Sequence, residues 1–372
     1  MERTKLVIVV LSSLCIFVVI AIALFLVFSS NILSSPSSNL NDCKTLINNG
    51  GKINLVFLSD KKNAEKYSDF LLNHEPFDKY KKEFSVYYID TYIPDCELYK
   101  EAALFCYSSR NVKAASSCPN DFIIVTKSEE QKIRSSAYMN FASINTNLPQ
   151  SVLLHEFGHV FANLADEYTK VSLQKNSKNC VSDCKNFDGK NEGCFEGCSN
   201  EDYFRSIDEG IMRTLSSSNF GEFDNHLIQE KMSKYDESIT GSAVENLNNE
   251  CKIQEYYLIE GIYLQNNTIS IIKKTLEYGC VGSTGTGTFS YTIFTSDGNT
   301  ISGTEFNPEL IFTDAQASNE SIINGGTLLS DKHFFIKVPV ISNSKTIEIS
   351  KLNESLAKTE IEGIGARPCK IN

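Results

Sequence analysis

Two histidines four residues apart, with a glutamate directly after the first, are the residues of this chain best suited to chemistry. The segment Ser151–Tyr168 reads SVLLHEFGHVFANLADEY and contains His155, Glu156 and His159. On a helix, residues four positions apart share a face, so both imidazoles can bind one metal ion. Glu156 then lies beside the metal, where its carboxylate can take the proton of a bound water.

The motif is specific enough to carry a prediction. With 5 histidines among 372 residues, about 0.004 matches to this pattern are expected by chance. The alternative is a helix that bears two ordinary surface histidines. Apolar residues such as Val152, Leu154 and Phe161 flank the motif, however, and such a flank is typical of a buried helix. Two imidazoles and one anionic residue would make a three-ligand zinc site with an open position for water.

The third ligand is expected to be Asp166 or Glu167. A straight helix would carry Asp166 about 16 Å past His155, so the chain must leave the helix after the second histidine and fold back. Asp166 is favoured because it is the first anionic residue after this turn. Glu167 is then a hydrogen-bond acceptor that holds a histidine N–H, or else the alternative ligand. A rival lies outside the motif, in a glutamate on a later helix such as Glu192 or Glu196.

Further along the chain, Met212 lies in a glycine-containing turn, either as an ordinary loop residue or as the floor of the metal site. Together these segments resemble the signature of the IgA-peptidase family of zinc metallopeptidases, which are metzincin-type enzymes. The resemblance covers about residues 52–232 and includes HEFGHVFANLADEY, NLVFLSD (54–60), EPF..Y...FSVYYID (75–90) and GIMR (210–213).

The resemblance implies a metzincin-like fold and one catalytic Zn²⁺. The residues implied are the ligands His155, His159 and Asp166, the catalytic base Glu156 and the Met-turn residue Met212. The chain departs from the wider pattern HExxHxxGxxH/D in three ways. Position 162 is alanine, the aspartate comes one residue late, and no tyrosine stands two residues after Met212.

Four cysteines lie between the histidine motif and this methionine, with the spacing Cys180-x3-Cys184-x9-Cys194-x3-Cys198. Cysteines four apart on a helix face the same way, so two short helices side by side could pair 180 with 198 and 184 with 194. The alternative is a structural zinc site with four thiolates. An extracellular location favours disulfides.

The N-terminus predicts a membrane anchor over residues 1–28. Residues 6–28 carry no charge and are long enough to cross a bilayer, and Arg3 and Lys5 precede them. The chain would then be a single-pass membrane protein with its N-terminus inside and the catalytic domain outside. If the segment is a cleaved signal, the protein is secreted. Residues 29–50 read as a Ser/Asn-rich tether.

The remaining sequence predicts two domains, one with both strands and helices and one with strands alone. Apolar runs at 53–58, 84–93, 121–126 and 136–144 read as strands, residues 63–72 as a helix, and Pro149 as the start of the motif helix. We therefore expect an α/β (α+β) metallopeptidase domain with a mixed sheet at 51–245. Residues 251–372 read as an all-β, immunoglobulin-like sandwich, with strands at 256–264, 268–276, 287–295 and 333–338. Hairpin turns are expected at Asn266-Asn267 and at Asp297-Gly298-Asn299.

Two classes of function fit these patterns. The first is a membrane-anchored extracellular zinc metalloendopeptidase, whose partners are a protein or peptide substrate and, through residues 6–28, the lipid bilayer. The second is an inert surface adhesin or receptor, in which the sandwich binds a cell-surface partner. The intact Glu156 favours the enzyme. The formal net charge of −11 disfavours nucleic acid as a partner.

Overall fold

The computed structural model describes residues 40–50, 52–169, 177–187, 193–237, 251, 254–282, 285–314, 326–328 and 332–361. All of them belong to one compact unit of the chain. The expected membrane anchor at 6–28, and the tether up to residue 39, lie outside the described residues. Among the residues that are described, we find no helix with both the length and the apolar character needed to cross a membrane.

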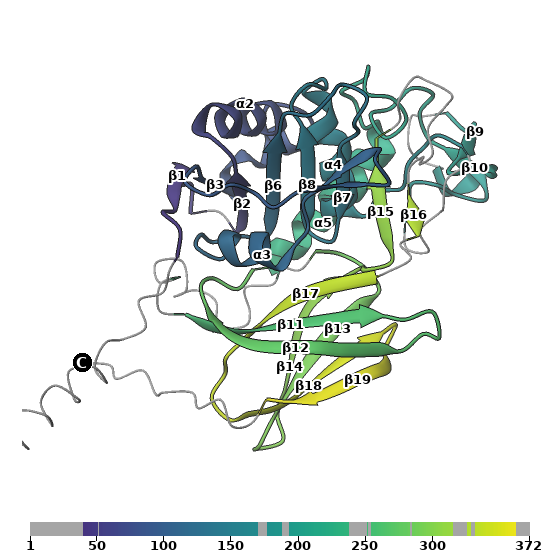
Figure 1. The fold of residues 1–372 in the computed structure, drawn as a ribbon. Coiled ribbons are helices and arrows are strands. Elements are labelled where there is room, and N and C mark those ends of the chain that lie inside the picture. Colours follow the sequence, from purple (N-terminus) through teal and green to yellow (C-terminus); the bar gives the residue numbers. More distant parts are fainter. Residues whose placement is uncertain are drawn as a thin grey trace, which may run out of the picture. The chain divides into compact units, whose positions relative to one another are not determined.

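An eight-stranded mixed sheet forms the first region of this unit (Figure 1). Its strand order is β1 (Lys44–Ile47), β3 (Phe84–Ile89), β2 (Ile53–Leu58), β6 (Phe122–Lys127), β8 (Phe141–Asn145), β7 (Ser136–Tyr138), β15 (Leu310–Thr313) and β16 (Thr327–Leu328). The four strands β3, β2, β6 and β8 are parallel, and the outer strands pair antiparallel with their neighbours. The fold class is thus mixed α/β with a mixed sheet, as the sequence predicted at this level.

Helices cover both faces of this sheet, and their bounds are α2 (Lys61–Leu72), α3 (Ser109–Ala115), α4 (Ser151–Ala162) and α5 (Glu222–Glu237). Leu55 and Phe57 of β2 share one apolar core with α2, α4 and α5. The residue between them, Val56, points to the opposite face and packs in the core that includes α3. Because both faces are covered, the parallel strands are continuous apolar runs.

The predicted elements of this region are confirmed with five changes of boundary. Strand β3 ends at Ile89, four residues before the expected end, and β6 is shifted by one residue to Phe122–Lys127. The stretch 136–144, read as one strand, is a hairpin of β7 and β8, since Met139 between them takes a φ of 55° and the chain reverses there. The helix expected to open at Pro149 begins at Ser151. The helix α2 begins at Lys61, two residues early, because the Asp60 side chain caps it by accepting the N–H of Asn63.

Two small antiparallel sheets form the second region. They contain β12 (Ile269–Tyr278), β11 (Glu255–Tyr263) and β17 (Lys332–Pro339), and β14 (Thr300–Phe306), β13 (Phe289–Thr295), β18 (Ser344–Lys351) and β19 (Glu354–Glu360). Aromatic rings join them, with centroids 4.9 Å apart for Tyr263 and Phe289 and 5.4 Å apart for Phe306 and Phe334. The four strands predicted here are confirmed. Both predicted turns link neighbouring strands, β11 to β12 and β13 to β14.

The segment 251–372, which we expected to form a separate sandwich domain, also contributes strands to the large sheet. Between β14 and β17 the chain crosses to the first region, where β15 pairs antiparallel with β7 through Phe312↔Ala137 and Thr313↔Ser136. Figure 1 shows β15 standing beside β7 in the large sheet. The three apolar residues of β15, Leu310, Ile311 and Phe312, are compatible with any sheet, so the sequence could not predict which sheet the strand joins.

Short elements complete the description: η1 (Phe77–Glu83), η2 (Cys184–Phe187), and the hairpins β4 (Glu97–Tyr99) with β5 (Ala103–Phe105) and β9 (Phe195–Cys198) with β10 (Asn200–Arg205). The ten cysteines of the described residues form five disulfides, namely 43–118, 96–106, 180–198, 184–194 and 251–280. Two of these pairs, 180–198 and 184–194, are those that the spacing predicted. The expected pair of helices is wrong, because Cys198 ends strand β9 and Cys184 begins η2.

Candidate metal centre

The helix α4 places both motif histidines on one buried face. The Nδ1 atom of His155 lies 2.9 Å from the Ile211 carbonyl oxygen, and Nδ1 of His159 lies 2.6 Å from that of Leu164. A carbonyl oxygen only accepts hydrogen bonds, so Nδ1 is the protonated nitrogen of each neutral ring. This leaves both Nε2 atoms free of hydrogen, and they point to the same spot, 3.2 Å apart.

A turn at the end of α4 brings Asp166 back to the histidines. Asn163 takes the left-handed conformation, with φ 57° and ψ 36°, which asparagine tolerates better than most residues. The N–H of Asn163 bonds to the His159 carbonyl, and the N–H of Leu164 bonds to that of Gly158. The helix therefore ends at Ala162, three residues after His159, and the chain folds back as the sequence required.

Three ligand atoms meet after this turn. Oδ1 of Asp166 lies 3.2 Å from Nε2 of His155 and 3.3 Å from Nε2 of His159. Together the three residues form the one group of possible metal ligands found among the described residues. All three side chains are at most 2% exposed. A triangle of two imidazole nitrogens and one carboxylate oxygen is a donor set that zinc prefers.

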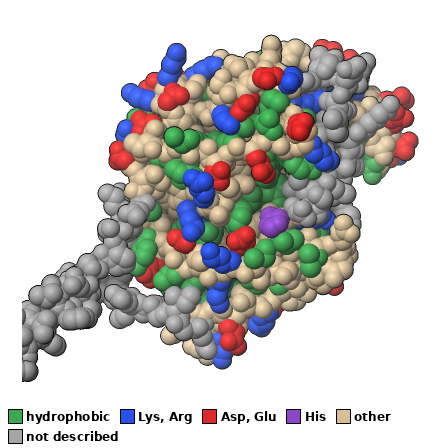
Figure 2. Space-filling model, in the orientation of Figure 1, with side chains coloured by type: hydrophobic (Ala, Val, Ile, Leu, Met, Phe, Trp, Pro, Cys, Tyr) green, Lys and Arg blue, Asp and Glu red, His purple; other side chains and the backbone are tan. Residues whose placement is uncertain are grey.

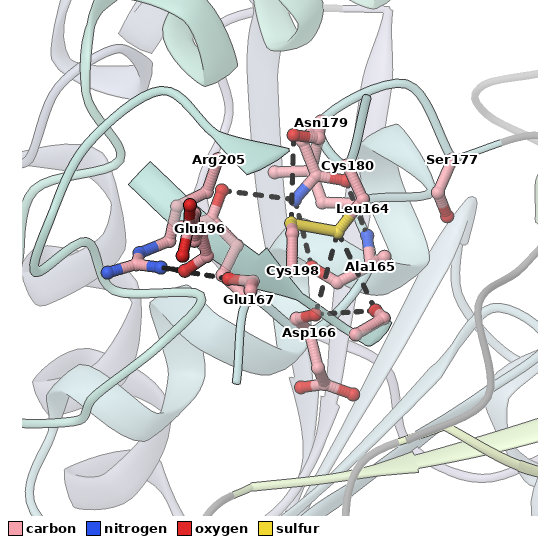
Figure 3. Close-up of a disulfide and its surroundings, with 12 residues drawn as sticks. Leu164, Ala165, Asp166, Glu167, Ser177, Asn179, Cys180, Glu196, Cys198 and Arg205 are labelled. Carbon is pink, nitrogen blue, oxygen red and sulfur yellow. Dashed lines mark hydrogen bonds between the residues drawn. A yellow bond between two sulfur atoms is a disulfide. The ribbon is translucent and has the colours of Figure 1, made fainter. Parts of the chain in front are cut away.

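A disulfide clamps the backbone that carries this aspartate (Figure 3). Cys180 and Cys198 are joined, and their chain neighbours Asn179 and Ser199 each bond to the segment. The Asn179 side chain accepts the N–H of Ala165 and donates to its carbonyl, while the Ser199 hydroxyl donates to the Asp166 carbonyl at 2.6 Å. The disulfide therefore holds the aspartate segment through Asn179 and Ser199, the chain neighbours of its two cysteines.

Met212, which the sequence analysis considered as a floor of the metal site, packs against the histidine helix α4. It is fully buried, and a Cβ added to Gly158 of α4 would lie 2.8 Å from its sulfur. Only glycine at this position allows the helix and the methionine to approach so closely. The preceding residue, Ile211, supplies the carbonyl that orients His155.

Two of the alternative third ligands, Glu167 and Glu196, do not join the group. The N–H of Glu167 bonds to the Met212 carbonyl, and its Oε1 accepts from Nδ2 of Asn179 at 3.4 Å. Its carboxylate therefore lies on the side of the clamp, where it supports the aspartate segment. Glu196 is exposed on strand β9 rather than on a helix, so it is not a rival ligand. Glu192 lies outside the described residues.

Glu156 lies next to the triangle in a fully buried position. Burial raises the pKa of its carboxyl well above the usual value, and the charges of Asp314 and Asp166 raise it further. The backbone N–H of Asp314 offsets this rise only in part, and no side chain donates a hydrogen bond to either carboxylate oxygen. A buried carboxylate with so little support is costly and therefore points to function rather than to stability.

Opposing influences set the charges of the ligands in the metal-free protein. Burial would raise the pKa of Asp166, but the two histidines hold it below the usual value. Burial lowers the pKa of both histidines. For His155 the hydrogen bond and charge of Asp166 outweigh burial and the pKa is raised, whereas for His159 burial prevails and the pKa is lowered. An ionised aspartate between two imidazoles suits a cation.

The structure adds residues that the sequence analysis missed. Asp314, at the end of β15, is fully buried, and its carboxylate accepts the N–H of Ser135 at 3.3 Å. Burial raises the pKa of Asp314 to about 6, against the opposing charges of His155 and Arg134. No spacing rule links these residues, because they come from distant parts of the chain.

Tyr168, the last residue of the motif, was also missed, although it stands in the same segment as the ligands. Its hydroxyl donates to the Thr313 carbonyl at 2.6 Å. Burial raises the pKa of Tyr168 well above the usual value, and the nearby charges of Asp166, Asp314 and Glu156 raise it further. The hydroxyl therefore stays protonated and remains a hydrogen-bond donor beside the site.

The site has little open space. A cavity of about 10 Å³ lies beside His159, between Phe312, Tyr138 and Asn163. A larger groove of about 460 Å³ shares Asn163 with this cavity and runs along α5. On the face seen in Figure 2, acidic and basic side chains of the described residues alternate and form no extended surface of a single charge.

Comparisons with known proteins add no name to this geometry. Neither a protein-family model nor a curated protein matches the chain. The three ligand atoms, the buried Glu156 and the orienting carbonyls are therefore the observations from which the function is argued.

Proposed function

We propose that this protein is a zinc metalloendopeptidase. The single observation that carries the proposal is the triangle formed by His155, His159 and Asp166, whose sides are 3.2, 3.2 and 3.3 Å. Zinc bound tetrahedrally by nitrogen and oxygen ligands at about 2.0 Å requires ligand atoms about 3.3 Å apart. The triangle thus has the dimensions of one face of a zinc tetrahedron, and three protein ligands leave a fourth position for water.

The orientation of the ligands supports the same proposal. Both imidazoles donate from Nδ1 to a carbonyl oxygen, which fixes the tautomer and leaves Nε2 for a metal. When bound, a zinc ion would act as a Lewis acid that lowers the pKa of water and polarises a carbonyl group.

Glu156 is the general base of the proposed reaction. The raised pKa of its carboxyl allows Glu156 to take a proton from the attacking water, hold it, and pass it to the leaving amine. The Tyr168 hydroxyl is a hydrogen-bond donor at the site. In the structure it donates to the Thr313 carbonyl, and in the proposed reaction it would donate to the carbonyl of the substrate instead.

The finer classification belongs to the same proposal. The histidine helix, the returning aspartate and the buried Met212 support a metzincin-like catalytic region, related to the IgA-peptidase family by the motifs of its sequence. The two packed sheets of the second region support an immunoglobulin-like sandwich. Residues 6–28 would anchor the enzyme in the membrane with its catalytic region outside the cell.

Peptide hydrolysis by the full chain tests this function. The zinc-loaded protein in detergent should cleave a peptide library, a chelator should stop cleavage, and zinc should restore it. Glu156→Gln should keep one zinc per chain but lose a factor of about 10²–10⁴ in rate, because the amide cannot take the proton. Glu65→Gln, on the surface of α2, is the matched control and should change neither property.

Two outcomes of this hydrolysis experiment would contradict the proposal. If Glu156→Gln cleaves as fast as the wild type, Glu156 is not the base. If the zinc-loaded wild type cleaves nothing under any condition, the protein is an inert surface adhesin or receptor.

A further inference from the structure

We propose that β15 is a built-in cover of the metal centre, which takes the place of an extended peptide and keeps the site closed until the strand moves away. The consequence for activity rests on the function proposed above. The cover itself is a property of the fold and can be tested without zinc or substrate.

The site is closed in the structure. His155, Glu156, His159 and Asp166 are between 0 and 2% exposed. The cavity of about 10 Å³ beside His159 has room for roughly one water molecule, since one water needs about 10–15 Å³. A peptide substrate, which must bring a carbonyl carbon to the metal, has no path to this position.

Three residues over the site lie in β15 or directly after it. The Phe312 ring stacks on the His159 imidazole, with centroids 4.2 Å apart and an angle of 16° between the planes. Thr313 accepts the Tyr168 hydroxyl, and Asp314 accepts the N–H of Ser135. The segment 312–314 therefore covers the ligand His159 and accepts hydrogen bonds from the Tyr168 hydroxyl and the Ser135 N–H.

The strand has the geometry of a bound peptide. It adds antiparallel to β7, the last strand that the first region supplies to its own sheet. Extended peptides bind to sheet edges in the same manner, through main-chain hydrogen bonds and alternating side chains. Such alternation is present in β15, where Leu310 and Phe312 face the helix core and Ile311 faces the opposite core.

β15 is attached to the large sheet by few residue pairs, two with β7 and two with β16, while its side chains pack into the cores on both faces. Its register with β7 contains only two residue pairs, Phe312↔Ala137 and Thr313↔Ser136. The chain departs from the second region after β14 and returns with β17, and the Tyr138 hydroxyl donates to the carbonyls of Pro308 and His333 near these two points. The described part of the excursion is thus fastened near Pro308 and His333, and β15 is held to β7 by a short ladder.

A crosslink across the two strands tests the cover. Ser136→Cys with Thr313→Cys places two thiols at directly opposite positions, a separation that suits a disulfide. Ser136→Ala with Thr313→Ala changes the same positions without a crosslink and is the matched control. Phe312→Ala opens the cover, and Phe306→Ala removes an equally buried phenylalanine of β14 that does not touch the site.

The readout is modification of individual histidines by diethylpyrocarbonate in the metal-free full chain, followed by mass spectrometry. The half-exposed His226 is the internal reference. Because modification of buried groups follows the population of the open state, the crosslink should slow modification of His155 and His159 by about tenfold or more, and Phe312→Ala should speed it by a similar factor. Phe306→Ala and the double alanine control should not slow it.

Peptide hydrolysis by the zinc-loaded proteins separates the cover from the function. If histidine modification responds as expected but no variant cleaves any peptide, the cover stands and the proposed function fails. If the crosslinked protein cleaves peptides as fast as its alanine control, the function stands and the cover is refuted. Equal rates of histidine modification in the crosslinked, wild-type and Phe312→Ala proteins also overturn the cover.

Discussion

The two regions of this molecule use their interiors in opposite ways. The first region buries Glu156, Asp166, Asp314 and Arg134 within one neighbourhood. In the two sheets of the second region, Lys337 is the one buried charged side chain among the described residues, and the core is otherwise aromatic and aliphatic. Burying charges lowers stability unless they are well paired. The buried charges of the first region lower its stability and are suited to chemistry, whereas the apolar core of the second region favours stability.

The sharpest contrast within the first region is between two neighbouring carboxylates. Asp166→Ala removes a ligand and should weaken zinc binding by more than about 100-fold, beyond the usual effect of an outer-shell residue. Glu167→Ala removes a support of the same segment and should weaken it by about 10–100-fold. Competition with a zinc indicator measures both affinities. If Glu167→Ala has the larger effect, the two residues exchange roles.

The two disulfides beside the site offer a second contrast. Replacing Cys180 and Cys198 by serine opens a loop of 18 residues, and replacing Cys184 and Cys194 opens one of 10. Each change should lower the free energy of unfolding by about 3 kcal/mol, because the unfolded chain regains similar freedom.

Zinc affinity should distinguish the two disulfides. Only the pair 180–198 has neighbours that hydrogen-bond to the aspartate segment, so only its loss should weaken zinc binding, by about tenfold or more. Denaturant unfolding and zinc titration of both double variants give the comparison. Equal zinc affinity in the two variants would remove the proposed role of the clamp.

The buried lysine of the second region makes stability depend on pH. Lys337 bonds to the side chain of Asn120 and to the Cys280 carbonyl, and burial lowers its pKa to about 7. Between this value and the ordinary pKa of 10.5, the unfolded chain binds the proton that the folded chain lacks. Stability should therefore rise as the pH increases across this window, and the penalty should be complete below pH 7.

Lys337→Met removes this titration and serves as the reference. Between pH 7.5 and 9, the wild type should gain about 1.4 kcal/mol per pH unit relative to the variant, the value for one proton. Urea unfolding of both proteins at matched pH measures the difference. A difference that does not change with pH would mean that Lys337 keeps its charge when folded.

An ion pair between the two regions should contribute less to the free energy of unfolding than the features above. Nζ of Lys113 on α3 lies 2.5 Å from Oε1 of Glu277 on β12, and both side chains are partly exposed. Lys113→Ala should lower the free energy of unfolding by about 0.2–1 kcal/mol, and 1 M salt should erase the difference because exposed pairs are screened. A loss that is larger and independent of salt would show that the pair positions the two regions.

Much of the fold was predictable because local patterns determine it. The apolar run that forms β2 and the aromatic and aliphatic residues of β11 each identify a strand, and the glycine of the turn at Gly298 takes a φ of 87°. The ligand spacing on α4 follows directly from helix geometry. The return of Asp166 was also predictable, since reach alone required a turn.

The cover was not predictable, for a physical reason. The residues of β15 pair with a strand more than a hundred residues earlier, and the contact of Phe312 with His159 follows from no local periodicity. The approach of Asp314 to Glu156 is likewise set by the crossing of the chain between the regions. Such contacts depend on tertiary topology, which the spacing of residues within one element does not encode.

The central claim is that His155, His159 and Asp166 bind one zinc ion, and X-ray absorption at the zinc edge tests it most directly. The oxidised full chain with one equivalent of zinc should show only nitrogen and oxygen neighbours at about 2.0–2.2 Å, and His159→Ala should lose one of the imidazoles. A sulfur shell at about 2.3 Å would place the metal on the cysteines instead. That result, or the absence of stoichiometric binding, would contradict the account.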